Sequence, residues 1–501
     1  MPTGLSRIST KDFDYWAALH LLQRAGFGGT PSQVFELKKK GPEDAVDHLL
    51  EFEQVEDGGV NAKVEGRFDN DIMRSLTADE RRQRNQARKN GNEAVLERFR
   101  NERQKRQRAD RRQLAELQSW WMARMIETRR PFQEKMTLFL HGHFATGYRA
   151  VEDSYHMFKQ NELFRSNVTG NFRDDLVRNI IRDPAMIKYL NNNQNSRRAP
   201  NENLARELME LFTLGEGRGY TEQDIKQGAR ALTGYTYRDD EFQFNAGNHD
   251  DEMKVIFGKR DKWDGDDFVD LIFARSSASE FICEKLYRFY VNDSSSTLEG
   301  PARSVVRQMA KTFKADNFEL KPVLRKLFLS RHFYDESNRS AIIKSPVQLV
   351  VQAIRSLGAP VRDVPRIVQS CSLMGQDLFK PPSVKGWDGG RKWINTSTLF
   401  TRQNTLIYLL TGRMPGSKPW DNNSSEFDAR HLLEHLRELT DRDREHDAVV
   451  YLSRFVIGTV PEEKRLVEWV DYVRERGGID DNPTIINLLA LMTAAPEYQL
   501  C

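Results

Sequence analysis

Cysteine is scarce in this chain, and long apolar runs are absent. The three cysteines, Cys283, Cys371 and Cys501, are far apart and odd in number, which excludes both a disulfide framework and a cysteine-rich metal cluster. No apolar run approaches the roughly 20 residues that cross a bilayer. The first 16 residues, MPTGLSRISTKDFDYW, lack a basic stretch followed by an apolar one. These absences indicate a cytoplasmic protein, with export by another route as the alternative.

A strong excess of charge is also missing, except in one segment. The net charge is +3 over 501 residues, which gives no global reason to expect nucleic acid or membrane binding. Residues 79–112 hold 13 Lys or Arg against 6 Asp or Glu and a single aromatic residue, Phe99. The lack of a stacking platform for bases argues against nucleic acid as a partner. We expect a basic arm, a solvated helix interrupted at Asn90–Gly91, with binding to an acidic surface or polymer as the alternative.

Apolar residues recur with helical spacing through most of the chain. The pattern predicts a mainly α protein, a large multi-helix assembly. One short β-hairpin is expected near residues 236–257, where the runs FQF and KVIF flank Asn-Ala-Gly-Asn. The predicted parts are an N-terminal helical part (1–78), the basic arm as an insertion (79–112), the main helical core (113–411) and a C-terminal helical bundle (412–501).

The stretch PNENLARELMELFTLGEG, residues 200–217, is predicted to form a helix with an unusual polar face. Asn203, Glu207 and Glu210 are spaced i, i+4 and i+7, so one amide and two carboxylates share a side. The residues four positions after each glutamate are leucines, so neither acid has a basic partner there. The two carboxylates are therefore either solvated or satisfied inside the protein.

A second polar group is His141–Gly142–His143 at the end of a predicted helix. In an extended backbone the two imidazoles would lie on one side and could bind a metal ion. In a helix they would point about 200° apart. The glycine between them leaves both arrangements open.

Several blocks in order along the chain resemble the uncharacterised bacterial family called domain of unknown function 1800. The blocks are HLLQRAGFG (20–28), EKMTLFLHGHFATG (134–147), the long stretch from DPAMIKYL to ALTGY (183–235), HDDEMKVIFG (249–258), MGQDLFKPPSVKGWDGGRKWINTSTLFTRQN (374–404) and the closing APEYQL. The resemblance covers nearly the whole chain, with residues 79–112 as an insertion. It implies no reaction, cofactor or catalytic residue. It does imply a partner, a sulfatase- or phosphatase-like exported protein encoded nearby, because members resemble proteins encoded beside such enzymes.

The first functional hypothesis is an enzyme, either a metal-assisted hydrolase or one that binds an anionic or sugar-like ligand. Polar residues next to helix ends, glycines or the hairpin are expected to meet in one cleft, covered by the loop 374–396. The candidates are His141 and His143 as ligands of a divalent metal ion, Glu207, Glu210 and His249 as catalytic residues, and Lys385, Trp387, Arg391 and Asn203 as ligand-binding residues.

Two alternatives compete with this hypothesis. In the first, the two carboxylates pair with arginines such as Arg178, Arg206 or Arg230, and His141 is a cation that caps a helix C-terminus. In the second, the chain is a non-enzymatic scaffold or maturation partner of the sulfatase- or phosphatase-like protein. The many helices and the basic arm favour this second alternative.

Overall fold

The computed structural model describes residues 4–57, 66–294, 297–413, 427–436 and 443–501. The predicted mainly α fold is confirmed: the described chain is predominantly helical, with two small antiparallel sheets. The predicted C-terminal bundle falls partly outside the described residues. No helix in the described ranges is long and apolar enough to cross a membrane.

The α-helices follow one another in chain order, with longer connections before α3, α12 and α18. The α-helices of the first half are α1 (Tyr15–Ala25), α2 (Pro31–Leu50), α3 (Ala78–Lys89), α4 (Glu93–Glu127), α5 (Pro131–His143), α6 (Tyr148–Val151), α7 (Ser154–Ser166), α8 (Arg178–Ile180), α9 (Pro184–Tyr189), α10 (Asn203–Glu207) and α11 (Glu222–Ala231). Those of the second half are α12 (Gly265–Phe273), α13 (Ser276–Tyr290), α14 (Gly300–Ala315), α15 (Leu320–Phe328), α16 (Pro346–Leu357), α17 (Val364–Leu373), α18 (Thr396–Thr411), α19 (Arg444–Ile457), α20 (Glu463–Arg476) and α21 (Asn482–Ala494). Two π-helices are η3 (Phe172–Val177) and η5 (Leu208–Thr213).

The strands form two hairpins where the sequence predicted one. β1 (Tyr235–Arg238) pairs with β2 (Glu241–Phe244), and β3 (Lys254–Ile256) pairs with β4 (Lys259–Asp261). The predicted pairing of FQF with KVIF is therefore wrong, because each run pairs with a strand next to it across a two-residue turn. Asp239 in the first turn, and Phe257 and Gly258 in the second, have positive φ, as tight hairpin turns require.

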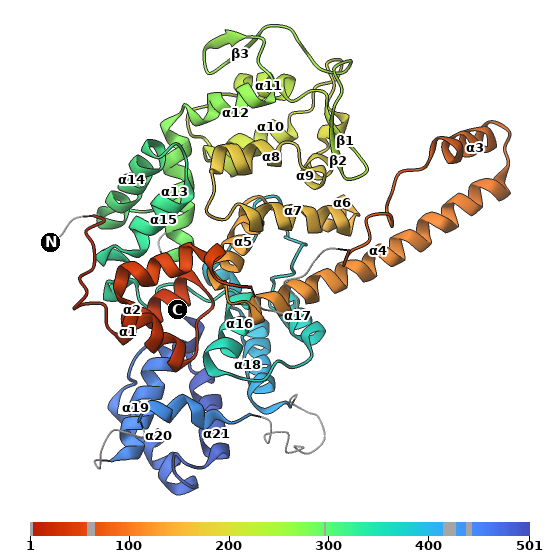
Figure 1. Ribbon diagram of the computed structural model, residues 1–501. Coiled ribbons are helices and arrows are strands. Elements are labelled where there is room, and N and C mark those ends of the chain that lie inside the picture. The colour runs from red at the N-terminus through yellow and green to blue at the C-terminus, as the bar shows by residue number, and fades with distance from the viewer. Residues whose placement is uncertain (1–3, 58–65, 295–296, 414–426, 437–442) are drawn as a thin grey trace.

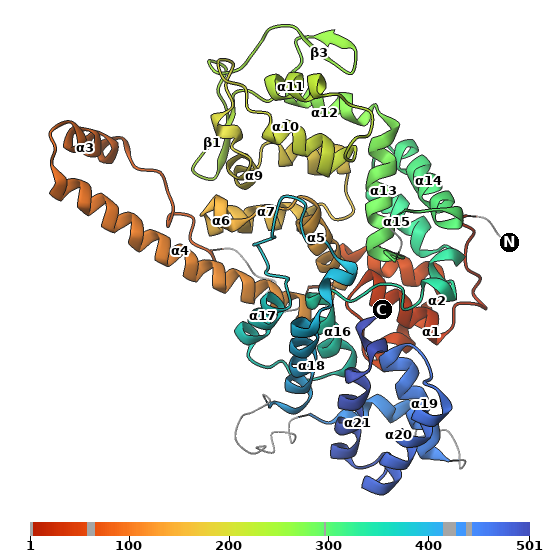
Figure 2. The same ribbon diagram turned by 180° about the vertical axis from the view of Figure 1, so that it is seen from behind.

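The helices are arranged in layers around α5. Figures 1 and 2, seen from opposite sides, show α5 and α7 between a layer that holds α8–α12 with the hairpins and a group that includes α1, α2 and α16. Helices α19–α21 form a lobe at the other end and pack on one another, and α21 packs on α18. Helix α3 and the first half of α4 extend away from the rest of the protein.

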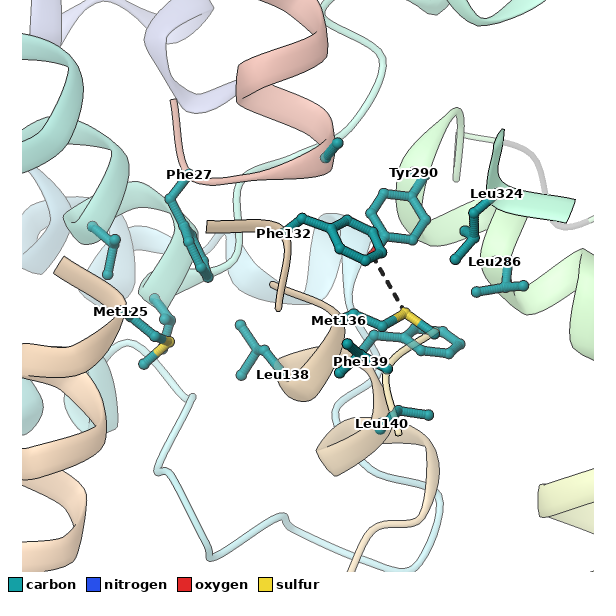
Figure 3. Close-up of a cluster of buried hydrophobic side chains, with 14 of the residues drawn as sticks. Phe27, Met125, Phe132, Met136, Leu138, Phe139, Leu140, Leu286, Tyr290 and Leu324 are labelled. Carbon is teal, nitrogen blue, oxygen red and sulfur yellow. Dashed lines mark hydrogen bonds between the residues drawn. The ribbon is translucent and has the colours of Figure 1, made fainter. Parts of the chain in front are cut away.

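Helix α5 is the centre of the core. It begins at Pro131, a residue suited to the first turn because its missing N–H needs no partner there. Every residue of α5 except Gly142 is buried, so this helix has no solvated face. Figure 3 shows its apolar side chains, Phe132 and Met136 among them, surrounded by residues of other elements such as Phe27 and Tyr290. The Tyr290 hydroxyl donates to Met136 Sδ at 3.4 Å.

A buried ion network fixes α5 to its neighbours. Glu134 is fully buried and accepts from Arg124 Nε of α4 at 2.5 Å and from Arg165 Nε of α7 at 2.7 Å. Its second oxygen accepts from Trp121 Nε1 at 2.9 Å. Burial alone would raise the pKa of Glu134, but Arg165 and Arg124 outweigh it and lower that pKa to about 2. The carboxylate therefore stays ionised, and it joins three helices.

The basic arm is made of α3 and the first half of α4. Thr77 and Glu80 form a capping box at the start of α3, and the predicted interruption at Asn90–Gly91 lies where α3 ends and α4 begins. Helix α4 then continues without a break into the core. Its first buried residue is Asp110, which accepts from the Tyr148 hydroxyl at 2.6 Å and from the Ser154 N–H at 2.8 Å. The exposed arm therefore ends before Asp110, inside the predicted segment 79–112.

Removing the exposed arm should leave the fold intact. Arg106 Nη1 donates to the Arg74 carbonyl at 3.3 Å, so a short Gly-Ser linker in place of residues 78–105 can join the two ends. We expect the midpoint of thermal unfolding to change by only a few degrees, because this segment contributes almost no buried apolar surface. Asp110→Ala should lower it more, since it leaves buried hydroxyl and N–H groups unpaired at about 1–3 kcal/mol. A larger loss from the deletion than from Asp110→Ala would contradict this assignment.

Breaking the buried network should be much more costly. Glu134→Gln leaves two buried guanidinium groups without their counter-ion, and we expect a loss of about 3–5 kcal/mol in the free energy of unfolding by urea denaturation. Glu162→Gln is the control, because Glu162 pairs with Arg165 at the partly exposed edge of the network; it should cost no more than about 1 kcal/mol.

The same network predicts a dependence of stability on pH. An unfolded glutamate has a pKa of about 4.3, and the folded pKa of Glu134 is about 2. The stability that Glu134 contributes is therefore complete above the unfolded value and is lost as pH falls toward the folded one. Between about pH 4.5 and 2, wild-type protein should lose more stability than Glu134→Gln. Parallel curves for the two proteins would contradict the ionised state of Glu134.

Candidate functional site

The two histidines of α5, His141 and His143, form hydrogen bonds to the backbone of two other segments. Both lie within the helix, so their rings point to different sides. His141 Nε2 accepts the Phe379 N–H of the loop 374–396 at 3.1 Å, and its ring lies against Trp121 and Trp387. Burial lowers the pKa of His141 to about 3, so it is neutral and is not the cationic helix cap of the alternative hypothesis.

His143 faces the π-helix η5. Its Nε2 lies 3.0 Å from the Phe212 carbonyl oxygen, to which it donates, and its ring stacks on Phe139. Burial, and then the charge of Lys285, lower the pKa of His143 to about 3. No group of three or more His, Cys, Asp or Glu in the described ranges is arranged to hold a metal ion. The structure does not bring the two imidazoles together as the predicted metal pair, because a helix separates rings that an extended strand would align.

His249 belongs to the packing beside the first hairpin. Its Nδ1 lies 2.8 Å from the Thr233 carbonyl oxygen, and its ring contacts Phe244. The next residue, Asp250, pairs with Arg230 at 2.6 Å. These contacts hold the His249 ring in place beside the hairpin.

Within the stretch 200–217, a short α-helix is followed directly by a π-helix. Helix α10 ends at Glu207, and the π-helix η5 continues it through Glu210 to Thr213. A π-helix leaves some backbone carbonyls free of the usual α-helical bonds, and such segments are often found at functional sites. The Phe212 carbonyl takes the bond from His143. The sequence predicted a regular α-helix here and missed this change.

The two glutamates of this stretch have different surroundings. Glu210 lies 3.3 Å from Arg206, as the structural alternative predicted, and Arg206 also binds Glu202 and Glu222. Glu207 is half-buried and makes no hydrogen bond or ion pair to another described residue. Burial, and then the neighbouring Glu210, raise the pKa of Glu207. One carboxylate thus has an arginine partner, while the other has none among the described residues and has a raised pKa.

The loop 374–396 lies against the end of α5. Gly386 has φ +79°, and a Cβ there would lie 2.3 Å from the Gly142 carbonyl oxygen, so this approach requires glycine. The neighbouring residues, Lys385 and Trp387, are placed beside the end of α5 by this close approach. The Trp387 ring lies over Gly142 and His141. Lys385 Nζ lies 3.5 Å from Glu216, and its charge also acts on Glu207.

Two predicted ligand-binding residues lie at the periphery. Arg391 is exposed in the short 3-10 turn Gly390–Trp393. Asn203 is exposed at the first residue of α10, and its N–H donates to Asn201 Oδ1 at 3.0 Å. Asn203 lies one helical turn before Glu207 on α10, so the two share a side of that helix.

The sequence analysis missed Lys285 of α13. This lysine has no ion pair to another described residue, and its Nζ lies 5.4 Å from the Phe281 ring centroid. Burial comes first among the effects that lower the pKa of Lys285, and the charges of Arg288, Arg218 and Lys385 add to it. The signal was readable: positions 281 and 289, four residues away on either side, are both Phe, so the lysine has no acid at helical spacing. We call Glu207, Glu210, Lys285, Lys385 and Trp387 the α5 terminal cluster.

The contact of Gly386 with α5 can be tested against a matched glycine. Gly389 also has a positive φ, +75°, but a Cβ there would meet nothing within 4 Å. Gly386→Ala and Gly389→Ala both place a side chain at positive φ, at a cost on the order of 1–3 kcal/mol each, and only the first adds a clash with backbone. We expect Gly386→Ala to lower the thermal midpoint further and to speed proteolysis of the loop. Equal effects of the two variants would show that the close approach is not maintained in solution.

Comparison with known proteins places the whole chain in one family. A family model described as "Protein of unknown function (DUF1800)" matches residues 20–500. No curated protein and no solved structure matches the chain. Because the matched region runs from α1 to the last residues, and includes the α5 terminal cluster, the chain belongs to the DUF1800 family.

Proposed function

We propose that this DUF1800 protein is a hydrolase-type enzyme that performs acid–base chemistry on an anionic or sugar-like ligand at the α5 terminal cluster. The observation that carries the proposal is the unequal pair of glutamates. Glu207, with its raised pKa and no partner among the described residues, suits a general acid. Glu210, beside Arg206, suits a base or charge stabiliser. A carboxyl group with a raised pKa beside a second carboxylate is a pattern found in acid–base sites.

The other members of the cluster suit the binding of such a ligand. Lys385 and Lys285 supply two cations close enough to influence each other, and cations of this kind hold sulfate, phosphate or carboxylate groups. The half-buried Trp387 offers an aromatic surface of the kind on which apolar ring faces pack. In this mechanism Glu207 donates its proton to the leaving oxygen while Glu210 accepts one from the attacking water.

The proposal can be tested with purified protein and chromogenic substrates. The panel consists of 4-nitrophenyl sulfate, 4-nitrophenyl phosphate and 4-nitrophenyl glycosides. For any activity found, we expect Glu207→Gln to reduce kcat about 10²–10⁴-fold, as loss of a general acid does. The matched control is Glu202→Gln, because Glu202 is a nearby glutamate that binds the same Arg206 at 3.0 Å. The control should keep its activity.

The pH profile adds a second readout. A general acid must be protonated, so kcat/KM should fall as pH rises through the raised pKa of Glu207, and that limb should be absent in Glu207→Gln. An activity that survives Glu207→Gln, or that Glu202→Gln reduces as strongly, would contradict the assignment.

A second candidate function is favoured by the arm. We infer that the arm can dock on an acidic surface of a partner, and that the sulfatase- or phosphatase-like protein implied by the resemblance is the one to test. The excess of 7 basic residues in 79–112, against a net charge of +3 for the whole chain, leaves the remainder acidic by 4. Arg81, Arg84 and Arg88 share one exposed face of α3 and have no ion pair to a described residue.

Docking through the arm predicts binding that depends on salt and on these arginines. With the purified partner, Arg84→Gln/Arg88→Gln should weaken binding in a biolayer interferometry titration, and added salt should weaken it further. Lys311→Gln/Lys314→Gln, two exposed lysines of α14, are the charge-matched control. Equal losses in both double variants would indicate a general charge effect and not a docking site.

A further inference from the structure

A large cavity lies at the opposite end of α5 from the proposed site. It has a volume of about 620 Å³ and lies between α1, α2, the C-terminal end of α4 and the α4–α5 connection. Pro131, the first residue of α5, lines it, and the α5 terminal cluster surrounds the last residues of that helix, about 18 Å away along its axis. The volume falls in the range of small-molecule sites.

The cavity combines apolar walls with a cationic mouth. The apolar lining residues are Leu22, Leu37, Leu49, Phe52, Val55 and Ile126, and all of them except Val55 are buried. Three exposed basic side chains, those of Lys40, His48 and Arg129, also line it. Lys40 reaches the rim where α2 changes direction at Gly41, whose φ is +76°.

The basic lining residues are not neutralised by acids. Arg355 donates from Nη1 to the carbonyls of Ile126 and Thr128 at 2.8 and 2.9 Å, at the C-terminal end of α4. Burial lowers the pKa of Arg355 to about 10. Lys40, Arg129 and Arg355 form no ion pair with any described residue.

The acidic residues near this cavity either form ion pairs with basic residues or lie at the edge of the cavity. Glu36 lines it and binds Lys39 at 2.9 Å. Asp57, next to Thr128, binds Arg124 at 2.7 Å. Glu127 is exposed at the rim. Positive charge therefore exceeds negative charge around the opening.

We infer that this cavity binds an amphiphilic anion, a carboxylate carried on an acyl chain. The apolar walls favour the chain by removing its methylene groups from water, at about 0.8 kcal/mol for each buried CH₂. Lys40 and Arg129 attract the carboxylate at the opening. A simple anion would leave the apolar walls unused, and a neutral chain would leave the basic residues unpaired.

Isothermal titration calorimetry with three probes separates these contributions. The probes are sodium dodecanoate below its micelle concentration, sodium butyrate as an anion with a short chain, and dodecyl maltoside monomers as the same chain with a neutral head. We expect dodecanoate to bind at least about tenfold more tightly than either of the others, a difference of roughly 1.4 kcal/mol or more. Equal affinity for butyrate or for dodecyl maltoside would overturn the inference.

Charge reversal at the opening provides the test in the protein. Lys40→Glu/Arg129→Glu changes two exposed side chains, so it should keep the fold, which circular dichroism can verify. We expect it to weaken dodecanoate binding at least about tenfold. Arg84→Glu/Arg88→Glu on the arm reverses the same number of charges far from the cavity and should leave the affinity unchanged. The inference would be overturned if neither double variant lost affinity for dodecanoate, or if both lost it equally.

A parallel experiment distinguishes a bilayer lipid from a free amphiphile as the source of the ligand. Sedimentation with phosphatidylglycerol vesicles that depends on Lys40 and Arg129 would identify a bilayer lipid as the source of the anionic amphiphile. Dodecanoate binding without such sedimentation would identify a free amphiphile. The cavity lies apart from Glu207, so a failure to bind dodecanoate would not contradict the proposed acid–base chemistry. For the same reason, Glu207→Gln should not change dodecanoate binding.

Discussion

The buried ion network at Glu134 is the constraint on which the rest of the structure depends. A carboxylate with no solvent exposure is stable only because Arg124 and Arg165 surround it, and these arginines come from α4 and α7. Desolvation of three charged groups is expensive unless the geometry is held closely. The network therefore fixes α4, α5 and α7 as one unit. Because α5 is buried along its length, its position determines which residues surround each of its ends.

The two ends of α5 have different chemical character. At the C-terminal end, the neutral His141 and His143 hold the loop 374–396 and η5 in place, and the charged residues of the α5 terminal cluster lie around them. At the N-terminal end, Pro131 borders a cavity with apolar walls and unpaired basic residues. The histidines illustrate a general point: a buried imidazole that is bonded to the backbone contributes to positioning and does not need to take part in chemistry.

The arm adds a separate physical element. Asp110 anchors it in the core through hydrogen bonds to Tyr148 and Ser154, and the arm before that residue is almost entirely solvated. A helix with few apolar residues cannot join a core, so its position away from the body follows from its composition. Its charge is opposite in sign to that of the remaining chain, which suits an electrostatic role and one that salt weakens.

The sequence by itself determined the helical fold, the break at Asn90–Gly91, the exposed arm and the family, because these depend on local periodicity, composition and motif order. It also directed attention to Glu207, since an acid without a helical partner is visible in the sequence. Only the tertiary structure decided the rest. Whether His141 and His143 face one ion depends on where the helix ends, and strand pairing depends on which neighbours meet. Lys285 and the cavity beside Arg355 involve residues far apart in the chain, which no local pattern brings together.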